Sequence, residues 1–169
     1  MSNKELIIQN DYQKFYKEEL PTYTKVTYTS NSGVIVILCA VGGIFFIGQT
    51  SRETHETSFE LIRGFIESGE SSREAAIREV DEELGVKIED SQLSSVNNIG
   101  IIHPDNALTN QKIYIELVQL KSNIPTPHLQ KSEGVISYHW LDKFEISEKI
   151  PRISDSLTLA ALAKLKLSK

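Results

Sequence analysis

Residues 64–86 read GFIESGESSREAAIREVDEELGV and carry the clearest structural signals in the chain. Ser71 and Glu74 form a capping-box pattern, in which each side chain satisfies a backbone amide at the start of a helix. Gly85 follows the last apolar residue of the run, as glycine commonly does where a helix stops. The pattern therefore predicts a helix over residues 71–84.

The predicted helix has one apolar face and one acidic face. At about 100° per residue, three aliphatic side chains fall within about 60° of one another: Ile77, Val80 and Leu84. Three carboxylates share about 100° on the opposite side: Glu79, Glu82 and Glu83. Neighbouring acids of this kind repel one another, and a divalent cation relieves the repulsion. The acidic face is either an ordinary solvated surface or a site where hard Mg²⁺ or Mn²⁺ binds together with phosphate.

The acidic character of the chain is concentrated around this helix. The 169 residues carry 23 acidic and 18 basic side chains, a net charge of -5. Residues 60–90 hold ten acids and four bases, a charge of -6, so the remaining 13 acids and 14 bases sum to +1. A hydrophobic share of 40% with so small a net charge is typical of a globular protein and argues against disorder.

Composition also indicates the cellular compartment of the protein and which binding partners are excluded. Cys39 is the only cysteine, so no disulfide forms within the chain and a reducing compartment is expected. No basic start followed by a long apolar stretch marks a signal peptide, and no run reaches the roughly 18 apolar residues of a membrane span. The basic footprint of a nucleic-acid-binding protein is missing as well. We therefore expect a cytoplasmic protein that binds neither membrane nor nucleic acid.

Around the helix, apolar runs predict strands and further helices without regular alternation. The β-branched run of residues 34–41, followed by Gly42-Gly43 and the apolar residues 44–47, predicts a buried hairpin. Further strands are predicted at 59–62, 99–102, 112–120 and 135–141, and further helices at about 11–20 and 155–167. This mixture indicates an α/β sandwich with a mixed sheet. Residues 1–32 are expected to be an N-terminal segment for packing or dimer contacts, and residues 33–169 the main domain.

Residues 64–86 match, at every specified position, the signature GX5EX7REUXEEXGU, in which U is aliphatic. This resembles the Nudix hydrolase box. The resemblance implies an α/β/α sandwich with a mixed β-sheet, in which a loop–helix–loop motif carries the catalytic groups. It also implies Mg²⁺ or Mn²⁺, with two or more ions bound in the presence of substrate. Arg78 and Glu70 would form an ion pair that holds the loop and the helix together.

The resemblance also assigns the metal ligands. Glu79 and Glu83 would be the principal ligands, with Glu82 adjacent. The backbone carbonyl next to the box glycine, that of Arg63 or Gly64, would join them. The ions would neutralise the pyrophosphate and lower the pKa of the attacking water, so no side-chain nucleophile is required.

The flanks of the box resemble the ADP-ribose and ADP-sugar pyrophosphatase branch of the family. In that branch a Gln-x-Arg-like segment ends a strand and a Glu-Leu-Pro-x-Gly-like segment precedes the helix; the matching stretches are QTSR at 49–52 and FELIRG at 59–64. The first stretch is one residue longer than in the branch, and Ile62 replaces the usual proline. The resemblance implies a substrate-binding set of Arg52 on the phosphates and Glu60 on the terminal ribose or metal shell, with Gln49 and Arg63 beside them.

Glu133 precedes the predicted strand 135–141, where members of this branch carry a mobile acid. It would be a general base or extra metal ligand, or else an exposed loop charge. The sequence thus predicts a Mg²⁺-dependent pyrophosphatase, with ADP-ribose as the first substrate and AMP and ribose 5-phosphate as products. The alternatives are hydrolysis of NADH, dinucleoside polyphosphates or nucleoside triphosphates, damaged ones included, or a catalytically silent nucleotide-sensing module. A homodimer is expected from the N-terminal segment and the family resemblance.

Overall fold

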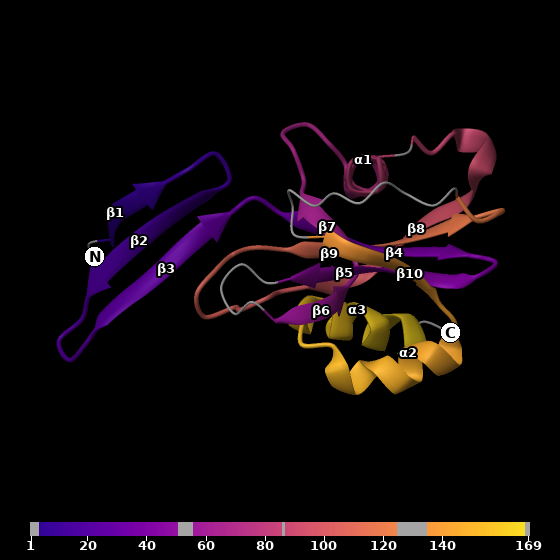
Figure 1. The fold of residues 1–169 in the computed structure, drawn as a ribbon. Coiled ribbons are helices and arrows are strands. Elements are labelled where there is room, and N and C mark those ends of the chain that lie inside the picture. The colour runs from indigo at the N-terminus through magenta and orange to yellow at the C-terminus, as the bar shows by residue number, and fades with distance from the viewer. Residues whose placement is uncertain (1–3, 51–55, 86, 125–134, 168–169) are drawn as a thin grey trace.

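The computed structural model describes residues 4–50, 56–85, 87–124 and 135–167. Its body is a seven-stranded mixed β-sheet with helices on both faces (Figure 1). The strands are β4 (Gly33–Ala40), β5 (Gly43–Thr50), β6 (Thr57–Glu60), β7 (Ile62–Phe65), β8 (Leu93–Ile102), β9 (Ile113–Leu120) and β10 (Val135–Leu141). Helix α1 (Ser72–Leu84) covers one face, and α2 (Lys143–Lys149) and α3 (Ser156–Leu167) cover the other. The predicted α/β sandwich with a mixed sheet is confirmed.

Strand β4 lies at the centre of the sheet because both of its faces are apolar. Val34, Val36 and Leu38 pack in the layer that contains α1, whereas Ile35 and Ile37 pack in the layer that contains α3. All five side chains are at most 1% exposed. A continuous apolar run, rather than an alternating one, is what a strand covered on both faces requires. Strand β4 pairs in parallel with β9 and antiparallel with β5 and β7.

Strands β4 and β5 separate soon after the turn that joins them. They pair directly only at Cys39–Ile44 and Ala40–Gly43. Beyond that point β7 pairs with the first half of β4, and β6 pairs with the second half of β5. The single strand predicted at 59–62 is therefore two short strands, because each follows a different member of the diverging pair. The loop after β7 leads directly into α1, which packs across β7 and β4.

Helix α1 begins and ends where its capping residues predict. The backbone N–H of Glu74 donates to the Ser71 hydroxyl at 3.2 Å, and the backbone N–H of Ser71 donates to the Glu74 carboxylate at 2.9 Å. Gly85 ends the helix in the left-handed conformation, with φ of 61°, which a side chain would strain. The predicted helix over residues 71–84 is confirmed to within one residue at its start.

The faces of α1 differ from the prediction in one respect. Glu79 is only 8% exposed, and Ile77, predicted to face the core, is half-buried. The full set of buried residues in α1 is Ala75, Ala76, Glu79, Val80 and Leu84. Ala75 and Ala76 were not counted in the apolar face, yet at about 100° per residue they flank Glu79 on both sides. Their small side chains bring the helix close to the sheet, so Glu79 lies on the buried side of the helix.

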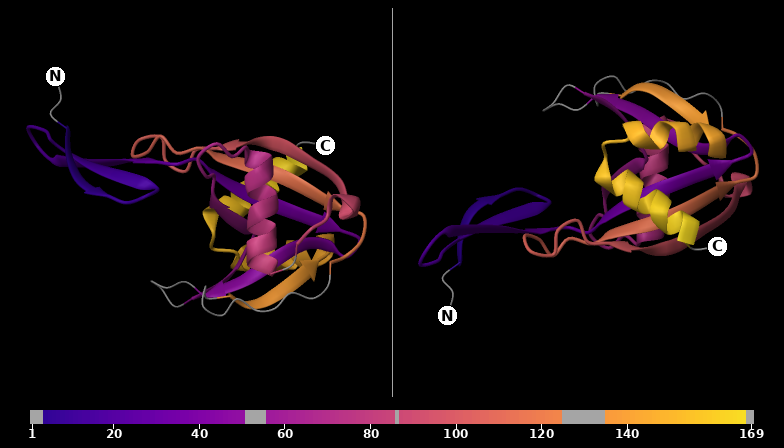
Figure 2. Two further views of the ribbon diagram at one scale, coloured as in Figure 1. Left: turned by 90° about the horizontal axis from the view of Figure 1, so that it is seen from above. Right: turned by 90° about the horizontal axis from the view of Figure 1, so that it is seen from below.

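The N-terminal segment is a small antiparallel sheet rather than a helix. Strands β1 (Lys4–Gln9), β2 (Gln13–Glu19) and β3 (Thr24–Ser30) pair in that order and extend away from the body (Figure 2). The helix predicted at 11–20 is wrong. Each residue of β2 pairs with one of β3, and the rings of Phe15 and Tyr28 stack at 5.4 Å across that pair. Such cross-strand contacts outweigh local helix propensity.

The C-terminal region carries one predicted helix and one that was missed. Helix α3 confirms the expected helix over about 155–167. Helix α2 was not predicted, although Asp142 and Glu145 form the same capping box as Ser71 and Glu74. Short 3₁₀ turns, η1 (Asp90–Gln92) and η3 (Ile150–Arg152), join the remaining elements. In the described part of the chain, no helix combines the length and the apolar character needed to cross a membrane.

Candidate active site

Arg78, in the second turn of α1, joins the loop before the helix to two acids of the helix. Its Nε and Nη2 atoms donate to the two oxygens of Glu70 at 3.0 and 3.1 Å. Its Nη1 donates to Glu79 Oε1 at 2.8 Å and to Glu82 Oε2 at 2.9 Å, and Nη2 also donates to the carbonyl of Phe65 at 2.7 Å. The structure thus contains the ion pair between Arg78 and Glu70, and the same guanidinium contacts two of the predicted metal ligands.

Hydrogen bonding and burial shift the pKa values of these groups in different directions. The paired hydrogen bonds from Arg78 lower the pKa of Glu70, and in return they raise the pKa of Arg78. Burial raises the pKa of Glu79, and the contact with Arg78 offsets this only in part. Because burial disfavours the charged form of Glu79, additional positive charge close to this carboxylate would stabilise it.

Gly64 in β7 provides the space that the Glu79 carboxylate occupies. A Cβ atom on Gly64 would lie 1.9 Å from Glu79 Oε1 and 2.0 Å from Glu79 Cδ, far inside van der Waals contact. Any other residue at position 64 would therefore force the carboxylate out of its place. The structure brings together two residues of the predicted metal set that are separated by 15 positions in the sequence.

Glu83 lies one turn after Glu79 and is half-buried, whereas the Glu82 side chain is 58% exposed. The backbone carbonyl of Glu83 accepts a hydrogen bond from the Tyr138 hydroxyl at 2.7 Å, which ties the end of α1 to β10. The carboxylate oxygens beside the glycine cradle are hard donors of the kind that Mg²⁺ and Mn²⁺ prefer. Among the described residues no three acidic, histidine or cysteine side chains meet at one point, and Arg78 holds Glu79 and Glu82 instead. A cation at these carboxylates would compete with Arg78 for their oxygens.

Arg63 precedes Gly64 in β7, so its side chain leaves the opposite face of the strand and reaches the start of α3. Its Nη2 lies 2.8 Å from Glu60 Oε2, and its Nη1 donates to Asp155. Asp155 also accepts from the backbone N–H of Thr158 at 2.7 Å and so caps α3. Asp155 was not among the predicted site residues. Its place three residues before Thr158 at a helix start is the sequence signal that could have identified it.

The other predicted site residues lie at the end of β5 or outside the described residues. Gln49 is half-buried in β5, opposite Ser58 of β6 and Val135 of β10. Arg52 and Glu133 fall outside the described residues, so their predicted roles stay predictions.

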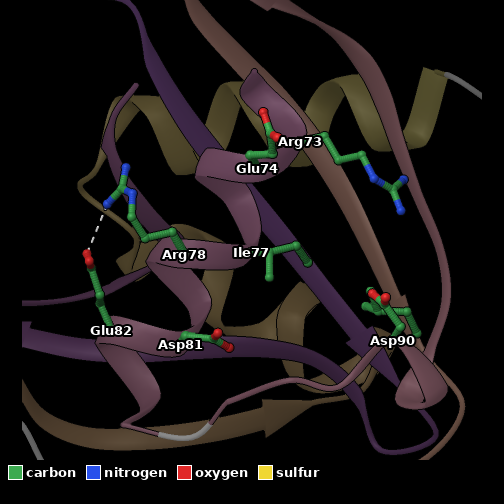
Figure 3. A pocket seen from close by; sticks show the side chains of 8 residues that line it. Arg73, Glu74, Ile77, Arg78, Asp81, Glu82 and Asp90 are labelled. Atoms are coloured by element: carbon green, nitrogen blue, oxygen red, sulfur yellow. Dashed lines mark hydrogen bonds and ion pairs between the residues drawn. The ribbon is translucent and has the colours of Figure 1, made fainter. Parts of the chain in front are cut away.

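A groove of about 590 Å³ runs along the outer flank of α1 (Figure 3). Its lining residues are Arg73, Glu74, Ile77, Arg78, Asp81, Glu82, Asp90 and Leu93. Arg78 and Glu82 are the predicted site residues among them. Neither Glu79 nor Glu83 lines the groove, so it lies beside the predicted metal ligands rather than over them. The groove explains why Ile77 is only half-buried.

These observations define a class of protein: an α/β sandwich in which a glycine-bearing strand, a loop and an acidic helix gather carboxylates and an arginine. A family model described as the NUDIX domain matches residues 29–159. Since the match covers most of the chain, the protein belongs to the Nudix family, and it is a Nudix pyrophosphatase. Enzymes of this family generally use divalent metal ions. The resemblance seen in residues 64–86 is confirmed.

The fold is also similar to that of a solved structure, described as the crystal structure of ADP compounds hydrolase. The two superpose with a TM-score of 0.67 over 97% of this chain and 90% of that chain, at 16% sequence identity. At 16% identity this similarity shows a shared fold and nothing more. The match covers 97% of the chain, so it extends into the N-terminal segment.

The contact between Gly64 and Glu79 makes a testable prediction. In Gly64→Ala the new methyl group displaces the end of a flexible side chain, so we expect a folded protein whose affinity for Mn²⁺ falls about tenfold, the cost of one misplaced ligand contact. Isothermal titration with Mn²⁺ measures this. Gly42→Ala is the matched control, because the atoms nearest its methyl group belong to Asn123 and Trp140 rather than to α1. Wild-type affinity in Gly64→Ala would show that the position of Glu79 does not matter for metal binding.

Proposed function

We propose that this protein catalyses the Mg²⁺-dependent hydrolysis of a nucleoside diphosphate linked to another group, with ADP-ribose converted to AMP and ribose 5-phosphate. One observation carries the proposal: the buried Glu79 carboxylate lies against the bare Cα of Gly64, one helical turn from Glu83, and is held by Arg78. The likeness in fold to a protein named as a hydrolase of ADP compounds supports this choice of substrate.

Glu79, Glu83 and Glu82 would hold Mg²⁺ or Mn²⁺, together with a backbone carbonyl at Arg63 or Gly64, and two or more ions would bind with the substrate. The ions would neutralise the pyrophosphate and lower the pKa of a bound water. Arg78 keeps Glu70 charged and fixes the loop to the helix, so the carboxylates keep their spacing when ions bind. Preorganised charge of this kind is the main means by which such sites stabilise a transition state.

The substrate side of the site would be formed by the strand ends around the split in the sheet. Gln49 and Glu60 lie on the paired strands β5 and β6, and Arg63 is on the neighbouring β7. Arg63 pairs with Glu60 and Asp155, so it would act on the substrate by orienting Glu60 as well as by its own charge. Arg52 would contact the phosphates, and Glu133 would serve as general base or extra ligand.

The alternatives are a hydrolase of NADH, dinucleoside polyphosphates or nucleoside triphosphates, and a silent nucleotide-sensing module. Purified protein with Mg²⁺ should be assayed against ADP-ribose, ADP-glucose, NADH, a diadenosine polyphosphate and the four nucleoside triphosphates, with AMP and pyrophosphate quantified. We expect AMP from ADP-ribose at the highest kcat/KM, no pyrophosphate from any triphosphate, and loss of activity with EDTA. Equal turnover on all substrates would refute the ADP-ribose preference, and no turnover on any would favour the sensing module.

A homodimer is the second part of the proposal. The N-terminal segment that forms β1–β3 contacts the body near its end and at one turn. Tyr28 N–H donates to the Leu108 carbonyl at 2.9 Å, and the Tyr12 ring stacks on Phe65 at 4.8 Å. The segment also exposes a concentration of large apolar side chains: Leu6, Ile7, Ile8, Tyr12, Tyr23 and Val26. A monomer rarely leaves such a surface open, and a second copy of the chain would cover it. The lone Cys39 is consistent with a reducing, cytoplasmic location.

The dimer is tested by light scattering on the full chain. We expect a mass twice the 19.0 kDa of one chain. Ile8→Lys places a charge at a side chain that is 60% exposed, so it should shift the mass toward one chain without lowering the stability of the body. A monomeric wild-type protein would disprove this part of the proposal and leave the hydrolase assignment intact.

A further inference from the structure

A buried carboxylate lies under the start of α1, away from the acids of the Nudix box. Glu116 in β9 is 2% exposed. Its Oε1 accepts two hydrogen bonds, from the Ser72 hydroxyl at 2.7 Å and from Asn98 Nδ2 at 2.8 Å. Ser72 is the first residue of α1, and Asn98 lies opposite Glu116 on β8. One carboxylate oxygen therefore joins the catalytic helix to two strands of the sheet.

The burial of position 116 does not by itself explain why the residue is a glutamate. Strand β9 is otherwise mainly aliphatic, and Val118, two residues later on the same face, is fully buried against the layer of α1. An aliphatic residue at 116 would pack without the desolvation that a carboxylate suffers. What it could not do is accept hydrogen bonds from Ser72 and Asn98. The distinct contribution of Glu116 is thus a directional contact with the first turn of α1.

Several hydrogen bonds of the described residues place α1 on the sheet. In the first turn, Arg73 also donates to the Val96 carbonyl of β8 at 3.1 Å. The middle of the helix is held by the bond from Arg78 to the Phe65 carbonyl, and its end by the bond from the Tyr138 hydroxyl to the Glu83 carbonyl. A helix of 13 residues moves largely as one body. The contact of Ser72 with Glu116 therefore helps to set where Glu79 lies along the helix axis relative to Gly64.

We propose that Glu116 is a positioning residue for the metal-binding helix: through Ser72 it fixes the first turn of α1, and thereby the placement of the Glu79 and Glu83 carboxylates. The inference rests on the proposed metal-dependent function of these carboxylates. Glu116 contacts neither the substrate nor the ions, and what it contributes is the acceptor oxygen rather than its negative charge.

Four variants of the full chain test this. Glu116→Leu removes the acceptor at similar volume, and Ser72→Ala removes the helix side of the contact while keeping a residue that favours helix. Glu116→Gln retains an acceptor oxygen for both partners. Ser95→Ala is the matched control. The Ser95 hydroxyl donates to Gln119 across the same two strands at 2.6 Å, but this hydrogen bond is exposed to solvent.

Two readouts apart from turnover decide the matter: the Mn²⁺ dissociation constant, by electron paramagnetic resonance, and amide hydrogen exchange across α1. We expect Glu116→Leu and Ser72→Ala to weaken Mn²⁺ binding about three- to tenfold, which corresponds to one lost hydrogen bond, and to speed exchange in α1 but not in α3. Glu116→Gln and Ser95→Ala should match the wild type. A purely structural role would lower the melting temperature of Glu116→Leu while leaving Mn²⁺ binding unchanged.

The proposal is overturned if Ser72→Ala binds Mn²⁺ as the wild type does, or if Glu116→Gln is as impaired as Glu116→Leu. Should Glu116→Leu fail to fold, Ser72→Ala still decides, because it leaves the bond between Asn98 and Glu116 in place. A wild-type protein that binds Mn²⁺ yet hydrolyses no nucleotide would refute the proposed function, while the exchange and Mn²⁺ data would still judge the role of Glu116.

Discussion

Glu83→Gln is expected to abolish Mg²⁺-dependent hydrolysis while leaving the fold intact. The substitution keeps the size of the side chain but removes the charge of a predicted metal ligand. Loss of groups that merely support a metal ligand costs about 10–100-fold, so loss of a ligand itself should lower kcat/KM by more than about a hundredfold. Steady-state kinetics with ADP-ribose over a range of Mg²⁺ concentrations measure the effect.

Two comparisons make the Glu83 result interpretable. Glu148→Gln removes the same charge from an exposed position on α2, on the opposite face of the sheet, and should retain wild-type kinetics. The circular dichroism spectrum and melting temperature of Glu83→Gln should match the wild type. If the variant kept wild-type turnover, the assignment of the metal to this helix face would be wrong.

Arg78→Lys is expected to have the largest effect on stability, even though it preserves the charge. The guanidinium donates from three nitrogens to Glu70, Glu79, Glu82 and the Phe65 carbonyl, a geometry that a single ammonium cannot reproduce. Leaving part of this partly buried network unpaired should cost about 2–3 kcal/mol, or a melting temperature lower by roughly 5–10 °C for a chain of this size. Activity should fall as well, because the loop and the helix would lose their fixed spacing.

Arg73→Lys is the matched control for Arg78→Lys, since Arg73 lies on the same helix but is exposed. Within the described residues its guanidinium donates only to the Val96 carbonyl, at 3.1 Å. The pH dependence gives a further check. Arg78 lowers the pKa of Glu70 in the folded state, so this pairing stabilises the fold above the unfolded pKa and is lost as pH falls through the folded pKa. The stability difference between wild type and Arg78→Lys should therefore shrink on acidification. A difference that is the same at neutral and acidic pH would contradict the role given to Glu70.

The local signals in the sequence predicted much of the fold because local interactions suffice for it. The ends of α1 follow from Ser71, Glu74 and Gly85, whose side chains and backbone act within a few residues. The buried strand β4 follows from its continuous β-branched run. The N-terminal segment could not be predicted in the same way, because β2 becomes a strand through its pairing with β1 and β3 rather than through its own propensity.

The candidate site shows the same division. The spacing within residues 64–86 predicted that Glu79, Glu82, Glu83 and Arg78 belong to one site and predicted the kind of chemistry they would serve. That spacing predicted Glu79 on the face opposite the core, whereas packing through Ala75 and Ala76 buries it. Glu116 carried no motif that marked it, since Ser72, its partner on α1, lies 44 positions away along the chain. Asp155 was marked only as a helix cap, and its contact with Arg63, 92 positions away, was not.

The family could be identified from the residues alone, and the acidic helix and the donor atoms for a metal ion could be predicted from them. These inferences depend on residue type and on spacing along one continuous segment. Only the tertiary structure decided how those donors are arranged. It put Gly64 against Glu79, let one guanidinium bridge three acids, and set a carboxylate from β9 under the start of α1. The physical reason is that short-range hydrogen bonds and steric contacts act through space, between segments that the order of residues alone does not bring together.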